Sequence, residues 1–477
     1  APLGIHSLAG HIRKLENQIE AAARRREREL GESGAENEEA FVETNLAEAE
    51  SVLRDDSLFE ELVVQRSRAY VKKSLAQEEG DVLFPQVEPP KVVPYSVKQT
   101  YGKILKMVEE AFSKSKPLFS LAMYYPWEYY TGHEDLKEQK KALTIGRQKQ
   151  VVRLIRTAFL KRFESSVYAF QRSCQTLMKK LIAFHQVHAE DKHDKELLER
   201  WFIRYKDVTG YDPLQGELFS ELEEGELDED VIEPEFFEQA EKKRLNPYEF
   251  DIPKLLAETR SDLETIGEFL RELAQFKPSQ DKKLRALIQL LKGQIRGLGD
   301  VALQKYKVLI FTEFMDTARY LEEQLKEAGF EDVVEIDSQS SSNGRLEVIK
   351  SFAPYYNDSS SAELADKGIR EIQYLISTDV LSEGLNLQDA TRLINYDLHW
   401  NPVRLMQRIG RVDRRLDPKT EARIIADHPE LEKYRGKVQY YNFLPPDELN
   451  ELLSLYKTVT HKTLRISKTF GIENGKL

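Results

Sequence analysis

Short apolar runs alternate with amphipathic stretches through the second half of the chain. Val308-Leu309-Ile310-Phe311 is continuously apolar, as a parallel strand buried on both faces requires. Further runs that predict strands are residues 333–336, 372–377, 392–397 and 438–443. Helical patterns separate them, for example around Thr317, Leu321 and Leu325. The alternation predicts an α/β fold with a doubly wound parallel sheet, in which ligands gather outside the carboxyl ends of the strands.

The first half of the chain reads as largely helical. A stripe of apolar residues at helical spacing consists of Leu8, Ile12, Leu15 and Ile19. Residues 252–276 form a long helical stretch, and residues 151–166 alternate apolar and basic positions at helical spacing. We therefore expect a helical region before the α/β part of the chain.

Composition limits the class of protein. At 477 residues the chain is long enough for about two or three domains with cores of their own. Charged residues make up 32% and hydrophobic residues 40%, which favours a soluble protein with charged helix faces. We expect no membrane span and no secretory signal, because no apolar run reaches about 18 residues. The single cysteine, Cys174, excludes an internal disulfide and fits the cytoplasm.

Charge is distributed unevenly along a chain of net charge -12. Residues 137–180 hold twelve Lys or Arg and two acids, which indicates a contact with the phosphate backbone of a nucleic acid. Arg153 and Arg156 are the candidate contacts within this stretch. The alternative is a solvated helix whose charge is offset by residues 217–238, which hold eleven acids and no base.

That acidic run is expected to form a loop or insertion, because it has little to bury. His185, His188 and His193 lie nearby in the sequence. Without cysteines or paired acids at ligand spacing, they read as surface histidines, and no metal site is predicted.

The pattern Gln-x-x-Gly-Arg-x-x-Arg, residues 407–414, is the main candidate for chemistry. Arg411 and Arg414 are three apart, so in a helix both guanidinium groups leave the same face. Two Arg side chains aimed at one place suit a polyphosphate. The alternative is a solvated face, or ion pairs with Asp413 and Asp417. Asn401 and Pro402 mark the start of the helix, as an N-cap and a first-turn Pro.

This motif and the preceding Ser377-Thr378-Asp379-Val380-Leu381-Ser382-Glu383-Gly384-Leu385-Asn386 resemble motifs VI and V of the superfamily-two helicases. The flanking strands match the second RecA-like lobe of the Swi/Snf-type ATPases, including the bacterial RapA-like proteins. Residues 58–68, a Pro-containing loop and an edge strand near residues 83–96 resemble the end of the first lobe. The string Lys161-Arg162-Phe163-Glu164-Ser165-Ser166 also resembles a helical segment of bacterial members, and indicates a place near the lobe junction.

The resemblance implies roles for individual residues. Gln407, Arg411 and Arg414 are expected to be catalytic, with the two arginines acting as arginine fingers. The residues expected to approach the nucleotide are Glu383, Gly384, Asn386 and Gly410. The residues expected to contact nucleic acid, besides the two arginines named above, are Thr312, Phe314, Ser377 and Thr378. Glu383 and Asn386 depart from the Gly-rich version of the motif, and simple turn chemistry is their alternative role.

The sequence contains no Gly-x-x-x-x-Gly-Lys-Ser/Thr and no apolar strand that ends in an Asp-Glu pair. ATP and Mg²⁺ are therefore expected to be bound mainly by a first lobe outside this chain. We expect this chain to be the C-terminal part of a larger protein and to be unable to hydrolyse ATP alone.

The leading hypothesis is the second motor lobe of an ATP-dependent translocase on double-stranded DNA. Expected partners are the first lobe and a protein such as RNA polymerase or a phage-defence component. The alternatives are a non-catalytic module that binds nucleic acid or protein, and a lobe of an RNA helicase. The expected domains are the end of the first lobe (1–100), a basic helical region (101–185), an acidic, largely helical insertion (186–275) and the second RecA-like lobe (276–470).

Overall fold

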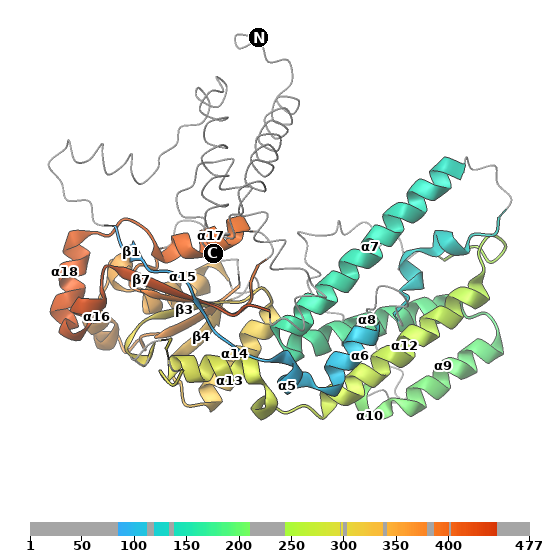
Figure 1. The fold of residues 1–477 in the computed structure, drawn as a ribbon, viewed down its shortest axis with the longest axis horizontal. Coiled ribbons are helices and arrows are strands. Elements are labelled where there is room, and N and C mark those ends of the chain that lie inside the picture. Colours follow the sequence, from blue (N-terminus) through green and yellow to red (C-terminus); the bar gives the residue numbers. More distant parts are fainter. Residues whose placement is uncertain are drawn as a thin grey trace, which may run out of the picture.

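A computed structural model describes residues 84–111, 119–132, 138–209, 244–295, 297–298, 303–336, 341–378, 386–399 and 402–445. Several sequence predictions lie outside these residues, namely the helices near residues 8–19 and 58–68, the acidic run 217–238, and Asn401, Glu383 and Gly384. Figure 1 shows two parts side by side, a sheet flanked by helices and a group of long helices. We call them the sheet lobe and the helical body.

The sheet lobe is built on a seven-stranded sheet in which each pair of neighbouring strands is parallel. The strands are β1 (Gln86–Val87), β2 (Lys91–Val92), β3 (Val308–Phe311), β4 (Val333–Ile336), β5 (Tyr374–Ser377), β6 (Arg392–Asn395) and β7 (Lys437–Asn442). The order is β1-β7-β6-β3-β5-β4, with β2 also paired to β7. The predicted α/β, RecA-like fold with a parallel sheet is thus confirmed.

Both faces of the sheet are covered, which explains why its central strands are apolar throughout. Val308 and Ile310 of β3 belong to a core shared with helices α13 and α14. Leu309 and Phe311, which point to the opposite face, share a core with α15 and α17. The lobe helices are α13 (Lys282–Leu291), α14 (Met315–Glu327), α15 (Ser342–Phe352), α16 (Ser361–Asp366), α17 (Pro402–Val412) and α18 (Pro418–Asp427).

The carboxyl ends of the central strands lie level with one another. Phe311 of β3 is in register with Ser377 of β5 and with Asn395 of β6. The segments that follow these strands therefore meet at one edge of the sheet, where the predicted site residues lie. We call it the carboxyl edge.

The helical body has one continuous apolar core, which includes buried residues from Val97 to Leu273. Its helices are α5 (Val97–Tyr101), α6 (Lys103–Ala111), α7 (Glu138–Ser165), α8 (Val167–His188), α9 (Lys192–Arg204), α10 (Lys206–Thr209) and α12 (Ile252–Ala274). The helical body also has two short 3-10 helices, Ala122–Tyr124 and Pro126–Tyr129. Four more 3-10 helices lie later in the chain, at Pro278–Gln280, Leu303–Lys305, Tyr355–Asn357 and Pro429–Tyr434. Helix α8 packs one face into this core, because buried apolar residues recur on that face at helical spacing, namely Phe170, Cys174, Leu177 and Leu181.

A turn separates α7 from α8 and points toward the sheet lobe. Ser166 has extended backbone angles and caps α8, since its Oγ accepts a hydrogen bond from the Ala169 N–H at 3.1 Å. The long basic stretch is therefore two helices, and its Glu164-Ser165-Ser166 segment lies at the contact with the sheet lobe.

Two expected domain boundaries do not separate structural units. The core of the helical body crosses residue 185, so the described parts of 101–185 and 186–275 pack together. The segment near residues 84–93, expected to close a first lobe, instead adds β1 and β2 beside β7 in the sheet lobe. It is an edge strand, as expected, but of the C-terminal sheet.

Candidate functional site

Helix α17, which carries the Gln-x-x-Gly-Arg-x-x-Arg motif, is fixed to the carboxyl edge by Arg408. This side chain is 1% exposed and its guanidinium donates a hydrogen bond to the Asp397 carbonyl at 2.9 Å. The guanidinium also lies 5.2 Å from the centre of the Phe311 ring. Arg408, a residue that the sequence did not single out, therefore sets the position of the helix on the end of the sheet.

Arg411 and Arg414 follow on the same segment and are both half-buried. Arg411 lies in the last turn of α17, which ends at Val412, and Arg414 lies just beyond that end. The expectation that one helix carries both arginines is thus only partly met. The Arg414 Nε nevertheless donates back to the Gly410 carbonyl at 3.2 Å, which holds its side chain beside the helix.

The two sequence motifs meet at this point. The Arg414 guanidinium lies 3.4 Å from Oδ1 of Asn386, which is 28 residues earlier in the chain. Asn386 is itself held in place by two hydrogen bonds. Its side-chain Nδ2 donates to the Tyr356 main-chain carbonyl at 3.2 Å, and its main-chain carbonyl accepts from Asn357 Nδ2 at 2.8 Å. The structure thus brings Asn386 and Arg414, one residue from each motif, together.

The surroundings of Gly410 and Gln407 leave room for a ligand. Apart from its chain neighbours and its own helix backbone, no atom of the described residues lies within 4 Å of a Cβ built on Gly410, and Gln407 is exposed. Guanidinium groups beside open backbone suit the oxygens of a phosphoryl group, so these residues fit the terminal phosphate of a nucleotide. Asp417, which was considered as an alternative ion-pair partner, caps α18 and accepts from the Thr420 N–H at 2.8 Å.

Ser377 and Thr378 end β5 at the same edge, and both are buried. The Ser377 hydroxyl donates to the Thr378 carbonyl at 2.7 Å. The Thr378 hydroxyl is buried without a hydrogen-bond partner among the described residues, and residues 379–385, which follow it, are outside them. An unpartnered buried hydroxyl is unfavourable unless a further group satisfies it.

Thr312 and Phe314 lie inside the molecule. Thr312 is 0% exposed and its hydroxyl donates to the Asp397 carboxylate. Phe314 is buried, with its ring 4.8 Å from the Arg162 guanidinium carbon. In this arrangement neither side chain reaches the surface to contact nucleic acid, because Thr312 bonds Asp397 within the sheet lobe and Phe314 packs against Arg162 of the helical body.

The basic helix α7 turns its C-terminal cations toward protein groups. Lys161 pairs with Glu313 at 2.8 Å and Arg162 with Asp316 at 3.3 Å. Arg156 donates to the Phe119 carbonyl at 2.6 Å. The Arg156 contact with nucleic acid is thus not supported by its position, and the side chain of Arg153 lies outside the described residues.

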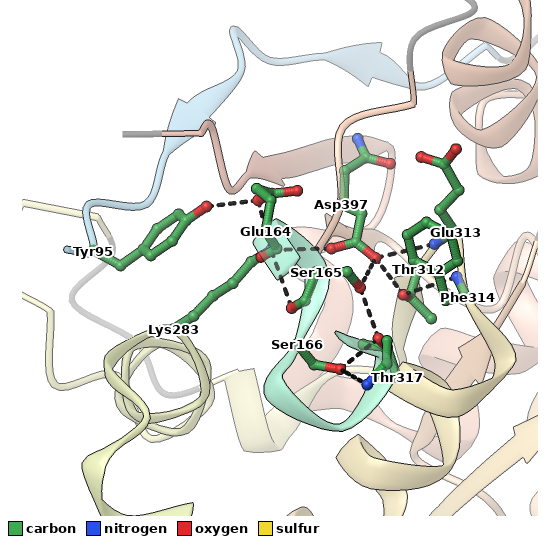
Figure 2. A network of polar contacts seen from close by, with 12 residues as sticks. Tyr95, Glu164, Ser165, Ser166, Lys283, Thr312, Glu313, Phe314, Thr317 and Asp397 are labelled. Atoms are coloured by element: carbon green, nitrogen blue, oxygen red, sulfur yellow. Dashed lines mark hydrogen bonds and ion pairs between the residues drawn. The ribbon is translucent and has the colours of Figure 1, made fainter. Parts of the chain in front are cut away.

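Asp397 is the centre of a buried polar network between the two parts, which we call the junction (Figure 2). Its carboxylate accepts from Lys283 Nζ at 3.0 Å, Ser165 Oγ at 2.8 Å and the Glu313 N–H at 3.1 Å. Lys283 also donates to the Glu164 carboxylate at 2.7 Å. The string that contains Glu164 was expected near a lobe junction, but no signal singled out Lys283.

Burial and pairing set the charges at the junction. Burial would lower the pKa of Lys283, but the carboxylates of Glu164 and Asp397 raise it above its usual value. Burial would raise the pKa of Asp397, but Lys283 and the hydroxyl donors hold it below its usual value. The pKa of Glu164 is raised by burial despite Lys283. Lys283 and Asp397 are therefore a charged pair.

No three His, Cys, Asp or Glu side chains among the described residues are grouped to hold a metal ion. Membrane-spanning helices are not found in the described ranges, where every helix is too short or too polar. The expectation of surface histidines is wrong for His185 and His188, which are 0% and 5% exposed because they lie on the buried face of α8. His193 is exposed, as expected.

A protein-family model matches the part of the chain that contains this site. Residues 282–415 match the helicase conserved C-terminal domain, a range that begins with α13 and ends just after Arg414. This part of the sheet lobe is therefore similar to a helicase C-terminal lobe.

Curated relatives match parts of the chain of comparable length. The "Uncharacterized ATP-dependent helicase YqhH" of Bacillus subtilis is 31% identical over 173 residues, which are 36% of this chain and 25% of that protein. The "RNA polymerase-associated protein RapA" of Vibrio vulnificus is 33% identical over 135 residues, 28% of this chain and 12% of RapA. The "Putative ATP-dependent DNA helicase fml2" of Schizosaccharomyces pombe is 27% identical over 183 residues, 37% of this chain and 22% of that protein.

The matched part thus spans a quarter or less of these relatives. The crystal structure of the C-terminal part of the Fun30 ATPase domain aligns with 78% of this chain and 90% of its own, at 16% identity and a TM-score of 0.32. At that score the two whole chains correspond only loosely.

Proposed function

We propose that this chain supplies the second motor lobe of an ATP-dependent translocase on double-stranded DNA, of the Swi/Snf type. A first lobe would hold ATP and Mg²⁺, and this lobe would close over the terminal phosphate. The observation that carries the proposal is the contact between Arg414 and Asn386 beside Arg411, which assembles the two motifs at the carboxyl edge. Residues 282–415, matched by the helicase C-terminal domain, contain this site.

Arg411 and Arg414 would act as arginine fingers. ATP supplies a phosphoryl group whose oxygens gain negative charge in the transition state, and fixed guanidinium donors stabilise that charge. Asn386 and the Gly410 carbonyl orient the Arg414 side chain before the ligand arrives, which reduces the cost of ordering it. Gly410 would let the backbone approach the phosphate, and the exposed Gln407 would donate to it. Glu383 and Gly384 stay predictions for the nucleotide side.

Nucleic acid would pass over the end of β5. A hydroxyl suits phosphate oxygens, and the buried Thr378 hydroxyl has no partner among the described residues. Ser377 stays a predicted contact, because its hydroxyl donates to the Thr378 carbonyl in this arrangement. Arg153 stays a predicted backbone contact. Contacts to phosphates are independent of sequence, as a translocase requires.

A protein partner would couple the motor to a pathway in the cytoplasm. One relative is named as associated with RNA polymerase, which makes RNA polymerase a candidate partner. A phage-defence component stays the other predicted partner.

The proposal is tested by measuring ATP turnover of this chain mixed with a separately expressed first lobe, with and without duplex DNA. We expect this chain alone to be inactive and the mixture to be stimulated by DNA. Arg411→Ala should lower the stimulated rate by roughly 10³-fold or more, as for other arginine fingers. Arg415→Ala is the matched control, because Arg415 is in the same run but exposed, and its rate should not change.

Two alternatives make different predictions in the same assay. An RNA helicase lobe, a class present among the relatives, would give turnover stimulated by RNA and not by duplex DNA. A non-catalytic binding module would bind nucleic acid or the first lobe without turnover, and Arg411→Ala would then have no effect on any rate. Either result would contradict the proposed motor on DNA.

A further inference from the structure

The junction and the arginine site share one residue. The side chain of Asp397 is held by Lys283, Ser165, Thr312 and the Glu313 N–H. The main-chain carbonyl of the same residue accepts the 2.9 Å hydrogen bond from Arg408, which fixes α17. Any shift of the Asp397 backbone is therefore passed directly to the helix that carries Arg411.

The helical body holds Asp397 in place directly through Ser165 and indirectly through Glu164. Ser165, the last residue of α7, donates to the Asp397 carboxylate at 2.8 Å. Glu164 beside it accepts from Lys283 at 2.7 Å, and Lys283 in turn contacts Asp397 at 3.0 Å. Figure 2 shows the Glu164-Ser165-Ser166 turn inserted between Lys283 on one side and Thr312 and Thr317 on the other.

The contact between the turn and the sheet lobe is buried, and it includes more residues than Glu164 and Ser165. Glu164, Ser165 and Lys283 are each less than 5% exposed. Thr317 at the start of α14 lies 2.7 Å and 2.8 Å from the Ser165 and Ser166 hydroxyls. Around this centre Lys161 and Arg162 pair with Glu313 and Asp316. Buried, fully paired polar groups tolerate only one arrangement, because displacement leaves charges unpaired in a medium of low polarity.

We propose that Glu164 and Ser165 are positioning residues for the arginine site, acting through Asp397 and Arg408. The helical body is then a fixed arm of the second lobe, which moves with α17 when the lobe closes. This inference rests on the proposed function for its kinetic consequence, but the fixed arm itself does not.

The sharpest variant pair changes two threonines that are both 0% exposed. Thr317→Val removes the hydroxyl that contacts Ser165 and Ser166 across the junction. Thr259→Val removes a hydroxyl that bonds only the Leu255 carbonyl within α12 of the helical body. The two changes are chemically identical, so general loss of stability affects both alike. Ser165→Ala is a second junction variant.

The kinetic readout is DNA-stimulated ATP turnover in the mixture with the first lobe. We expect Thr317→Val and Ser165→Ala to lower kcat about tenfold, because misplaced groups of the arginine site slow the catalytic step. KM for ATP should be unchanged, because the nucleotide is bound mainly by the first lobe. Thr259→Val should leave both unchanged. An absence of turnover in the unsubstituted mixture would refute the proposed function and leave the structural readout below.

The structural readout is a distance distribution between two spin labels in the chain alone. Cys174 is 1% exposed and would not be labelled, so labels attach to Ile203→Cys in α9 and Val403→Cys in α17, whose native side chains are 71% and 39% exposed. We expect a narrow distribution that Thr259→Val preserves and that Thr317→Val and Ser165→Ala broaden.

Each outcome decides the proposal. A loss of kcat confined to the junction variants, together with broadened distances, supports it. Unchanged kcat in both junction variants overturns the positioning role even if distances broaden, and an equal loss in Thr259→Val does the same. Distances unchanged by both junction variants overturn the fixed arm held by these residues.

Discussion

Asp397 at the junction and Asp262 in the helical body are two aspartates with almost no exposure, 1% and 0%. Asp397 is paired with Lys283 and accepts further hydrogen bonds, and its pKa lies below the usual value. Asp262 accepts two backbone N–H groups, from Ser120 and Leu121, each at 2.6 Å. Burial outweighs these bonds and raises the pKa of Asp262 to about 7.

The difference shows what each region uses a buried carboxylate for. At the junction a cation neutralises the carboxylate, so a charged group can join elements that are far apart in the chain. In the helical body the carboxylate holds one loop, where Leu121 has a positive φ of 59°, an unfavourable angle for a residue with a Cβ. We expect the two regions to differ in their response to loss of a charge and to pH.

The largest expected effect is on the junction. Lys283→Met leaves Glu164 and Asp397 buried without a cation and should lower the free energy of unfolding by about 3 to 5 kcal/mol. Urea unfolding measures this loss. The matched control is Lys103→Met, because Lys103 also pairs with a glutamate, Glu272, but is 69% exposed. Such a surface pair contributes about 0 to 1 kcal/mol.

A triple variant sharpens the same test. Lys283→Met combined with Glu164→Gln and Asp397→Asn removes the charges together, and should be less destabilised than Lys283→Met alone. Equal losses in the single and triple variants would show that lost packing, and not an uncompensated charge, dominates at the junction.

The next effect concerns pH and Asp262. The folded pKa of about 7 is above the unfolded value near 4, so the folded state keeps the proton while the unfolded state releases it. Stability from this group is therefore lost as pH rises from about 4 to about 7, by roughly 3 to 4 kcal/mol. Arg156 lowers this pKa and Glu258 raises it, but both act less than burial.

Urea unfolding of Asp262→Asn at several pH values tests this prediction. The stability of the variant should fall less between pH 4 and 7 than that of the unsubstituted protein. Asp397→Asn is the contrasting variant, because a lowered folded pKa gives stability that is lost only as pH falls through that pKa. Identical pH profiles for the two variants would contradict the comparison.

The smallest effect is expected from His185, whose contribution to stability changes with pH in the opposite direction to that of Asp262. Burial and the nearby Arg260 lower the pKa of His185 to about 4, although Asp194 acts the other way. The unfolded state binds the proton first, so stability from this group is lost as pH falls from about 6.5 to about 4, by roughly 2 to 3 kcal/mol. His185→Gln should therefore steepen the fall in stability between pH 4 and 7, measured by the same unfolding series. A flatter profile would reverse the assignment.

Much of the sheet lobe could be read from local pattern. The run Val308-Leu309-Ile310-Phe311 and residues 333–336 are β3 and β4 without change, and 392–397 contains β6. Continuous apolar runs predict buried parallel strands because both faces are covered. The meeting of Asn386 with Arg414 also follows from pattern, since the carboxyl ends of parallel strands lie at one edge.

The orientation of the basic helix could not be read in this way. Helical spacing shows that Arg156, Lys161 and Arg162 share a helix with apolar residues, but not which protein group each one faces. The Phe119 carbonyl, Glu313 and Asp316 are their partners in the structure. A cation near an apolar stripe can equally contact phosphate, solvent or a buried acid.

The sequence by itself determined the order of strands and helices along the sheet lobe, and it predicted a site at the carboxyl edge that includes Arg411 and Arg414. These features depend on neighbours in the chain, whose spacing is visible in the sequence. Only the tertiary structure decided that Glu164, Lys283 and Asp397 form one buried network, since Lys283 lies 119 residues from Glu164 and 114 from Asp397. Their charges are stable in the interior only because folding brings them together, and no local pattern records that pairing.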